Sequence, residues 1–521
     1  MGTVDPWIPS VLGVDEDEWV VGEDALLLPQ SQILRSVKRA ITEDKADLPI
    51  HNGTHRVSVD ADQAIKAILS NVVRTAGDNF IDLGEEDTVR LGCPAMWTGD
   101  QRLRLLRLAN QAGLAVGDST LIDEPIAAGI AWINHMLRDG QAVKGKVLVF
   151  DMGGGTLDVA VLDVAAVPGR EPSISVQSSV GIAEAGDSLD EKLVEILEQK
   201  YTDAGLVLNS RAQGVELRSW LKPSAARAKV ELGHELDVPV VVRVPGFDLP
   251  VVSLGREELE DAFRPQLDRA MDTVWWALRA ALMSQVASRT QALSLTPSEA
   301  RAKPTADLAA GIDYVLLAGG MAKVPAVLRS LSQHFDGDRI YIGAGGDPSE
   351  AIVTGLGERG DYERLNLHRP GFDFILSWIH PDTGVTKERL VYRAHTPLYS
   401  AQSVLETNST RYLWRPQPND LPDMGKGELR VQSLTGQRIG FRFEDQDGDS
   451  LPVWFGRGDF VVTLEPNGRV FFRDSFGREK AMRVAQWPVI RGVGFEAIRM
   501  ESLDDRSFKV PELVWHQKPY D

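Results

Sequence analysis

The stretch VLVFDMGGGTLDVAVLDV (residues 147–164) decides how this chain folds. A run of apolar residues ends at Asp151, a glycine turn follows, and a second apolar run begins at Leu157. Apolar runs bounded by glycine predict two buried strands joined by a turn. Backbone N–H groups of a glycine turn can hold phosphate oxygens, and a carboxylate beside it can hold the water shell of Mg²⁺. The stretch therefore suggests a phosphate site, against the alternative of an ordinary tight turn whose aspartate binds a backbone N–H.

Composition restricts the function classes. The chain has 521 residues, 43% of them hydrophobic, which predicts two or three domains. Its formal net charge of −19 argues against nucleic-acid and anionic-membrane partners. Cys93 is the only cysteine, so neither an intrachain disulfide nor a cysteine zinc cluster is expected. With no secretory pattern at residues 1–10 and no apolar run of membrane-spanning length, the sequence predicts a cytoplasmic protein.

Strand and helix patterns alternate over the first 358 residues, which is typical of an α/β fold. Apolar residues recur at helical spacing in residues 29–41, 61–76, 99–112, 126–134, 186–198 and 256–283. Asp187 or Ser188 is the expected cap of the helix near residue 186. Strand patterns occupy residues 8–13, 88–95, 120–125 and 313–320.

Beyond residue 360 the pattern changes to alternating apolar and polar residues, and no long helix is expected. Residues 461–473 predict a hairpin, because Asn-Gly readily supplies a type I′ turn. The sequence is thus divided into an α/β domain (1–358), a linker (359–371) and a β-rich C-terminal domain (372–521), expected to be a sandwich. The linker offers Leu365 and Leu367 as its aliphatic residues.

Several motifs resemble, in order and spacing, the nucleotide-binding domain of the seventy-kilodalton heat-shock (DnaK-type) chaperones, within the actin-like ATPase superfamily. They are FDMGGGTLDV (150–159, the second phosphate loop), IDEPIAAGIAW (122–132) and DPSEAIVTG (347–355, the two connecting segments), VLLAGGMAKVP (315–325, the adenosine loop) and LKPSAARAKVEL (221–232, the adenosine helix). The resemblance covers residues 6–358.

The resemblance implies roles for individual residues, with ATP or ADP and Mg²⁺ as ligands. It makes Asp151 the residue that orders Mg²⁺ through waters, places Glu124 and Asp158 near the attacking water, and makes Lys38 the cation beside the transferred phosphoryl group. The implied nucleotide contacts are Gly153, Gly154, Gly155 and Thr156 for the phosphates, Lys229 for the ribose, and Gly319, Gly320 and Lys323 for the base.

The adenosine motifs also depart from the family. Ala226 and Val230 replace a ribose-contacting glutamate and a base-stacking arginine, and Lys323 replaces a second arginine. An ammonium stacks on a base less well than a guanidinium does. The sequence therefore predicts loose contact with adenine or preference for another base.

The family's first phosphate loop has no counterpart here. The segment FIDLGEEDT (80–88) is rejected as a substitute, because its acidic run would repel phosphate. By resemblance, the missing hairpin belongs at the centre of the first lobe's sheet. Three explanations stay open: a start upstream of Met1, an incomplete lobe, or another segment in that place. The expectation for these 521 residues is nucleotide binding with weak or no hydrolysis, so enzyme activity is left open.

Three functions remain in competition. The first is a divergent heat-shock-type chaperone that binds ATP and polypeptide clients, with co-chaperones as further partners. The second is a pseudo-ATPase scaffold that binds a protein partner. The third is an actin-like filament protein or sugar kinase, which ranks last because neither needs a β-rich tail.

Overall fold

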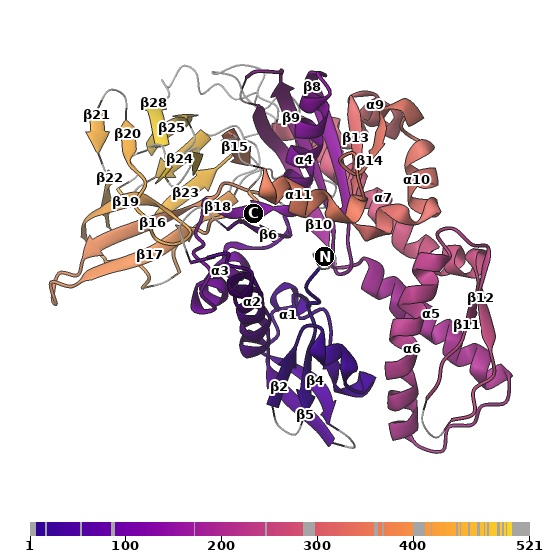
Figure 1. The fold of residues 1–521 in the computed structure, drawn as a ribbon. Coiled ribbons are helices and arrows are strands. Elements are labelled where there is room, and N and C mark those ends of the chain that lie inside the picture. The colour runs from indigo at the N-terminus through magenta and orange to yellow at the C-terminus, as the bar shows by residue number, and fades with distance from the viewer. Residues whose placement is uncertain are drawn as a thin grey trace.

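A computed structural model gives the structure of the chain over residues 7–502 (Figure 1). Its description leaves out residues 16–17, 53–54, 85–88, 171, 245–246, 285–296, 359–362, 367–368, 400–411, 418, 444–445, 449, 457–458, 466–468, 474, 477–478, 487–489, 492–493 and 496–497. Two lobes flank a gap in the lower half of Figure 1, and a β-rich part lies at the upper left. No helix of the described residues has the length and apolarity that a membrane crossing requires.

The predicted glycine hairpin is the centre of the largest α/β sheet. Strands β8 (Val143–Met152) and β9 (Leu157–Ala166) pair antiparallel, and the strand order in the described chain is β14-β13-β8-β9-β10-β15. Its other members are β10 (Ser173–Ile182), β13 (Tyr314–Ala318), β14 (Ile340–Ile342) and β15 (Glu363–Asn366).

Both faces of this sheet are covered by helices, which explains the unbroken apolar runs. Side chains alternate between the faces: Leu148 and Phe150 join the core beneath α7 (Arg256–Ser284), while Val147 and Val149 join the core beneath α4 (Glu124–Arg138). The prediction of two buried strands joined by a glycine turn is confirmed.

The N-terminal lobe combines small sheets with helices around one apolar cluster. It contains β1 (Leu12–Asp15), β2 (Glu18–Val21), β3 (Ile33–Leu34), the hairpin of β4 (Asp47–Asn52) and β5 (His55–Asp60), the parallel pair β6 (Leu91–Cys93) and β7 (Leu121–Asp123), η1 (Asp24–Leu27), η2 (Gln30–Gln32), α1 (Arg39–Thr42), α2 (Ala61–Asp78) and α3 (Gly99–Gln111). The predicted helices at 61–76 and 99–112 are confirmed as α2 and α3.

The predicted helix at residues 29–41 is wrong. The segment forms η2, β3 and, after a break, the short α1. Ser36 adopts φ of 55°, a left-handed conformation that cannot continue a helix. The apolar spacing was real, since Val37 and Ile41 are both buried, but it arises from a strand followed by a turn.

The second lobe begins at residue 186. It contains α5 (Gly186–Asp203), α6 (Arg211–Glu231), β11 (Asp237–Val240) and β12 (Val252–Gly255). Helix α5 begins at Gly186 after Ala185 and has no side-chain cap, so the expected cap at Asp187 or Ser188 is wrong. The chain then returns to the central sheet through α7, α8 (Pro297–Ala302), α9 (Thr305–Ala310), η3 (Gly320–Lys323), α10 (Pro325–Ser332), η4 (Gly337–Arg339), η5 (Pro348–Glu350) and α11 (Ala351–Gly357).

The β-rich region, defined here as residues 372–502, contains only strands among its described elements. One sheet has the order β17-β16-β19-β22 and another the order β18-β23-β24-β25-β28-β20-β21, and both contribute to one apolar cluster. The strands are β16 (Phe372–Ile379), β17 (Thr386–Tyr392), β18 (Tyr412–Trp414), β19 (Gly425–Ser433), β20 (Phe441–Phe443), β21 (Gln446–Gly448), β22 (Leu451–Phe455), β23 (Val461–Leu464), β24 (Arg469–Arg473), β25 (Glu479–Gln486), β26 (Ile490–Arg491), β27 (Gly494–Phe495) and β28 (Ile498–Ser502).

The predicted hairpin at 461–473 is confirmed by the antiparallel pairing of β23 and β24. Its Asn-Gly turn lies outside the described residues.

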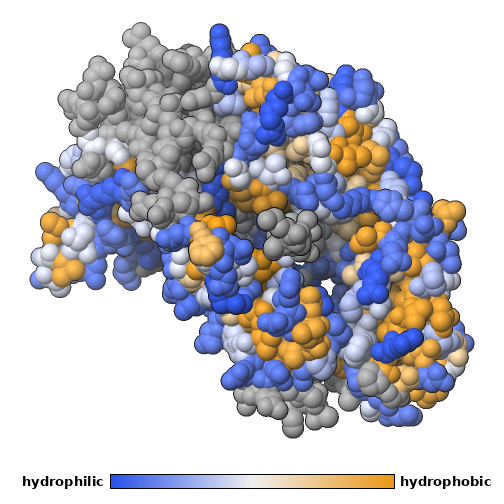
Figure 2. Space-filling view, viewed as in Figure 1, coloured by the Kyte–Doolittle hydropathy of each residue, from blue (hydrophilic) through white to orange (hydrophobic). Residues whose placement is uncertain are grey.

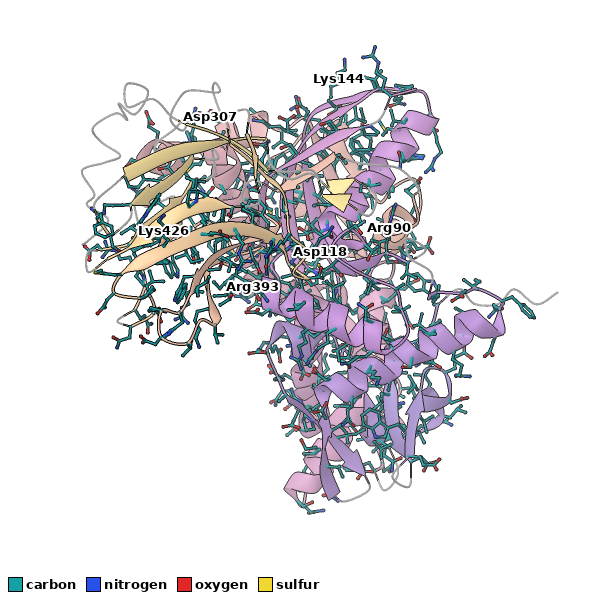
Figure 3. The ribbon with its side chains drawn as sticks, turned by 90° about the vertical axis from the view of Figure 1, so that its left-hand side faces the viewer. Arg90, Asp118, Lys144, Asp307, Arg393 and Lys426 are labelled. Atoms are coloured by element: carbon teal, nitrogen blue, oxygen red, sulfur yellow. The ribbon has the colours of Figure 1, made fainter. Side chains whose placement is uncertain are left out.

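The β-rich region contacts the rest of the molecule at several points. Strand β15, which lies in the expected linker, pairs in parallel with β10 and so extends the central sheet; Leu367 lies outside the described residues. Arg393 forms an ion pair of 2.7 Å with Asp100 of α3, and Ser433 donates to Asp118 at 2.9 Å. Figure 3 shows Arg393 and Asp118 where the β-rich region meets the helical part.

Candidate functional site

Two buried aspartates face each other where the central hairpin begins its turn. Asp151 of β8 and Asp158 of β9 are partners in the strand register, and the two residues are only 3% and 1% exposed. The backbone N–H of Met96 donates to Asp158 Oδ1 at 3.2 Å. Asp151 Oδ1 and Asp158 Oδ2 are buried and have no hydrogen-bond partner. Buried polar atoms normally have partners, so these two oxygens indicate a place for a bound ligand.

The N-terminal lobe brings a lysine and a third carboxylate to the same place. Glu124 is the first residue of α4, and Lys38 immediately precedes α1. Their side chains form an ion pair and hydrogen bond, Lys38 Nζ with Glu124 Oε1. The ammonium also lies 5.7 Å from the centre of the buried Trp97 ring, a cation–π distance. The four residues predicted as catalytic are therefore gathered at one site.

The charges of this cluster shift its pKa values. Burial, together with the charges of Glu124 and Asp158, raises the pKa of Asp151 well above its usual range. Burial and the charge of Glu124 raise the pKa of Asp158 to about 7. Partial desolvation disfavours the Lys38 ammonium, whose side chain is 48% exposed, but Glu124 and Asp158 outweigh it, so the Lys38 pKa is raised. The Lys38 ammonium thus lies among three carboxyl groups, and a bound cation would favour the ionised form of the two aspartates.

The cluster fits a hydrated cation better than a directly chelated one. Among the described residues, no group of three or more histidine, cysteine, aspartate or glutamate side chains is arranged to hold a metal. Mg²⁺ usually keeps several waters and is held by one or two carboxylates. The unpartnered oxygens of Asp151 and Asp158 could accept hydrogen bonds from such waters. Asp151 and Asp158 are therefore the residues that could hold Mg²⁺.

The first residues of helix α5 hold the glycine turn through backbone hydrogen bonds. Gly153 donates to Thr156 O at 3.1 Å, which closes the turn. The N–H groups of Gly186 and Asp187 donate to the carbonyls of Gly153 and Gly154 at 3.1 and 2.7 Å. With these carbonyls bound to α5, the turn is fixed in one orientation against the helix.

Gly319 closes the site from the adjacent strand. It follows β13 with φ of 80°, and a Cβ here would lie 2.3 Å from Met152 O and 2.8 Å from Asp151 Oδ1. Only glycine combines that dihedral with that contact. Gly320, the first residue of η3, has open space where a Cβ would point.

Residues from three of the predicted motifs lie around Gly186. A Cβ on Gly186 would lie 3.0 Å from Lys229 Nζ of α6, 3.2 Å from Gly153 O and 3.4 Å from Met321 Sδ of η3. The phosphate turn, the adenosine helix and the adenosine loop therefore meet at one residue.

The lysines of the expected adenosine site already have acidic partners. Lys229 pairs with Asp190 at 2.7 Å, and Lys323 pairs with Asp347 at 2.6 Å. The hydrogen bond from Lys323, with others from Ser349, lowers the Asp347 pKa to about 2. Val230, at the position of the family's stacking arginine, is 62% exposed. A base bound here would meet an aliphatic side chain and paired lysines.

A cleft of about 690 Å³ separates the two lower lobes, and Figure 2 shows the hollow between them. Its lining comes close to the glycine turn through Arg39 and Asp187 but includes none of the predicted site residues themselves. Its lining includes Arg39, Asp187, Asp190, Lys222 and Ala226. Arg39 bonds to Glu43 and lies 4.0 Å from Asp187 across the cleft. Its Cγ is 3.4 Å from where a Gly155 Cβ would lie, so Arg39 is a second cation beside the turn.

Sequence reasoning missed Arg39, Gly186 and Asp190. Arg39 directly follows Lys38, and Gly186 precedes an acidic helix start, so a search of residues next to the predicted motifs could have found both. Asp190 carried no signal, because its importance arises from its ion pair with Lys229.

Asp158→Asn should stabilise the unliganded protein more at pH 8 than at pH 5. The folded Asp158 carboxyl, with a pKa of about 7, binds its proton more tightly than the unfolded side chain, so wild-type stability falls as pH rises toward 7. Asparagine removes this loss, a relative gain of roughly 2–3 kcal/mol. Melting curves in EDTA measure it, with Asp163→Asn on the exposed side of β9 as the control. A gain that is the same at both pH values would contradict the assigned environment.

The comparisons with known proteins agree on one family. The family described as Hsp70 protein matches residues 9–356. Relatives include the proteins named Chaperone protein DnaK of Thermosipho africanus (24% identity, 82% of this chain and 64% of the relative), Thermotoga maritima (25%, 72% and 57%) and Elusimicrobium minutum (27%, 67% and 50%). The chain thus spans between half and two thirds of the length of these relatives.

Fold and site define a mixed α/β protein with a cleft between two lobes and, outside the lining of that cleft, a cluster of buried carboxylates, a lysine and a glycine turn. With two thirds of its length matched by the family, the chain belongs to the Hsp70 family, and the resemblance inferred from its motifs is confirmed.

Proposed function

We propose that this chain binds Mg²⁺ with ATP or ADP in the cleft between its lobes, as a divergent Hsp70-type chaperone. The observation that carries the proposal is the pair of buried, unpartnered oxygens on Asp151 and Asp158 beside the glycine turn. They face the ion pair of Lys38 with Glu124, so a cation and an anionic phosphate chain would each find an opposite charge.

Each residue has a role in this proposal. Asp151 orders the metal waters, and Asp158 and Glu124 orient an attacking water. Lys38 stabilises charge on the terminal phosphoryl group. The turn at residues 153–156 lies against the phosphates, with the N–H groups of Gly154, Gly155 and Thr156 as donors, because the Gly153 N–H is bonded to Thr156 O. Bound Mg²⁺ would neutralise phosphate charge. The proposed base and ribose contacts are Lys229, Gly319, Gly320 and Lys323.

The proposed domain division assigns residues 1–358 to an actin-like nucleotide domain, 359–371 to a linker and 372–521 to a β-sandwich that binds extended polypeptide clients. Strand β17 supports the last assignment, because it lies at the edge of its sheet among the described strands and is largely exposed. Edge strands can add an extended peptide by main-chain hydrogen bonds. Co-chaperones are proposed partners by family membership.

A scaffold that binds a protein partner without nucleotide is the second candidate. One observation favours it: Lys229 and Lys323 are paired with Asp190 and Asp347, which reduces their availability to a nucleoside. A wild-type chain that binds neither ATP nor ADP with Mg²⁺ would favour this candidate.

Asp151→Asn is expected to weaken Mg·ATP binding at least about tenfold, because a neutral amide holds metal waters less strongly than a carboxylate. The same change replaces a carboxyl group whose charged form is disfavoured by burial and by its neighbours, so the unliganded variant should melt no lower than wild type. Calorimetric titration with Mg·ATP and a thermal melt measure the two effects. Asp163→Asn on the same hairpin is the matched control, and unchanged affinity in Asp151→Asn would refute the site assignment.

A further inference from the structure

A backbone arch at residues 94–97, next to the candidate site, is bound by buried arginines. From α3, Arg102 Nε donates to Trp97 O at 3.0 Å, and Nη2 donates to Ala95 O at 3.3 Å and to Pro94 O at 3.5 Å. The remaining carbonyl of the arch, that of Met96, accepts from Arg369 Nη1 at 2.9 Å. Arg369 belongs to the segment between β15 and β16 and is only 8% exposed.

Met96 connects Arg369 to a carboxylate of the candidate site. Its carbonyl accepts from Arg369, while its N–H donates to Asp158 Oδ1 at 3.2 Å. The arch has little space to move, because a Cβ on Gly181 of β10 would lie 2.8 Å from Asp158 Oδ1 and 3.0 Å from Met96 Cβ. A displacement of the Met96 peptide would therefore alter the hydrogen bond to Asp158.

The position of Arg369 is set by the β-rich region. The next residue, Pro370, accepts at its carbonyl from the N–H of His395 at 2.9 Å. On the other side of Arg369, strand β15 pairs with β10 up to Asn366. Arg369 is thus held between the central sheet and the β-rich region.

We propose that Arg369 is a positioning residue for Asp158, acting through the backbone of Met96. By this contact the seating of the β-rich region fixes the geometry of a buried carboxylate of the candidate site. The nucleotide consequence rests on the proposed function, whereas the contact between the two residues can be tested without nucleotide.

The test is a double-mutant cycle of thermal melts at pH 8 in EDTA, with Arg369→Met and Asp158→Asn alone and together. Arg369→Met removes the donor to Met96 O and a charge that interacts with Asp158, so the ionised carboxylate is less well supported. Asp158→Asn should then raise Tm by at least about 2 °C more in the Arg369→Met background than in wild type. Strict additivity would overturn the proposal.

Arg393→Met is the matched control. It removes ion pairs of the β-rich region with Asp100 and Asp373, and those ion pairs do not involve residues 94–97. Its effect should add to that of Asp158→Asn within about 1 °C. Arg369→Lys keeps the charge and a donor, and should behave like wild type. If Arg369→Met does not fold, the cycle is repeated with Arg369→Gln and with Arg369→Lys. Coupling in the Arg369→Gln cycle together with additivity in the Arg369→Lys cycle, as in the Arg393→Met control, supports the proposal, and an additive Arg369→Gln cycle overturns it.

Titration with Mg·ATP separates this inference from the proposed function. Several-fold weaker binding by Arg369→Met, with Arg393→Met unchanged, supports both. Coupling in the melts without Mg·ATP binding by the wild type means that Arg369 positions Asp158 but the nucleotide assignment is wrong. If Mg·ATP binds normally and the Arg369→Met and Asp158→Asn effects are additive, the nucleotide assignment is supported and the proposed role of Arg369 is wrong.

Discussion

Gly355→Ala is expected to lower the free energy of unfolding by about 3–5 kcal/mol. Among the substitutions proposed for this chain that add one methyl group, it has the largest expected effect. Gly355 lies in α11 where this helix crosses α4. A Cβ there would lie 1.8 Å from Ala127 O and 2.5 Å from Ala127 C. These are backbone atoms inside α4, so they cannot yield without moving the helix.

The same substitution should disturb the candidate site, because Glu124 is the first residue of α4. Thermal unfolding and Mg·ATP titration are the two measurements. Gly357→Ala in the same helix is the control, since nothing lies within 4 Å of its added Cβ and alanine favours helix. Ala127→Gly should not rescue Gly355→Ala, because the clash is with the backbone of residue 127. Rescue, or equal melting of the two glycine variants, would mean that the helix crossing is not as close as described.

Arg102→Met should cost about 3–5 kcal/mol, because it breaks a buried ion pair by removing one partner. Arg102 Nη1 lies 2.5 Å from Asp123 Oδ1, and both residues are buried. The substitution leaves the Asp123 carboxylate without its cation and leaves the carbonyls of Ala95 and Trp97 without this donor.

Two further variants make this prediction specific. Arg107→Met removes an exposed ion pair of the same helix with Asp62, and should change stability by less than about 1 kcal/mol. Adding Asp123→Asn to Arg102→Met should recover part of the loss, because no unpaired charge then remains. If melting curves show that the double variant is less stable than Arg102→Met alone, the loss of stability comes from the unpaired carbonyls of residues 94–97 and not from the broken ion pair.

Much of the candidate site could be predicted because its centre is local in sequence. Asp151 and Asp158 lie opposite each other in one hairpin, so the pattern of apolar runs and glycines already brought them together. Lys38 and Glu124 were found through motifs, although the continuous helix expected over residues 29–41 is replaced by η2, β3 and the short α1. Apolar spacing over residues 29–41 is compatible with either structure, and the left-handed Ser36 that breaks the segment has no signal in side-chain periodicity.

The contacts that could not be predicted join residues far apart in the chain. The ion pairs of Lys229 with Asp190 and of Lys323 with Asp347 show that two expected nucleotide contacts have internal partners. Arg39 was not recognised because its neighbour Gly155 lies far from it in the sequence. In each case the chemical character of the side chain was evident, but its partner was set by packing.

The amino-acid sequence by itself determined the α/β alternation, the glycine hairpin and the residue types that the site requires, because strand burial and turn chemistry depend on neighbours within a few residues. The tertiary structure alone decided that Lys38 reaches Glu124, that Gly319 closes over Asp151, and that Arg369 reaches the arch at Met96. Those contacts join segments separated by 86 to 273 residues, as for Lys38 with Glu124 and Arg369 with Met96. Local patterns cannot encode such distances, because the lobes and the β-rich region must first pack against one another.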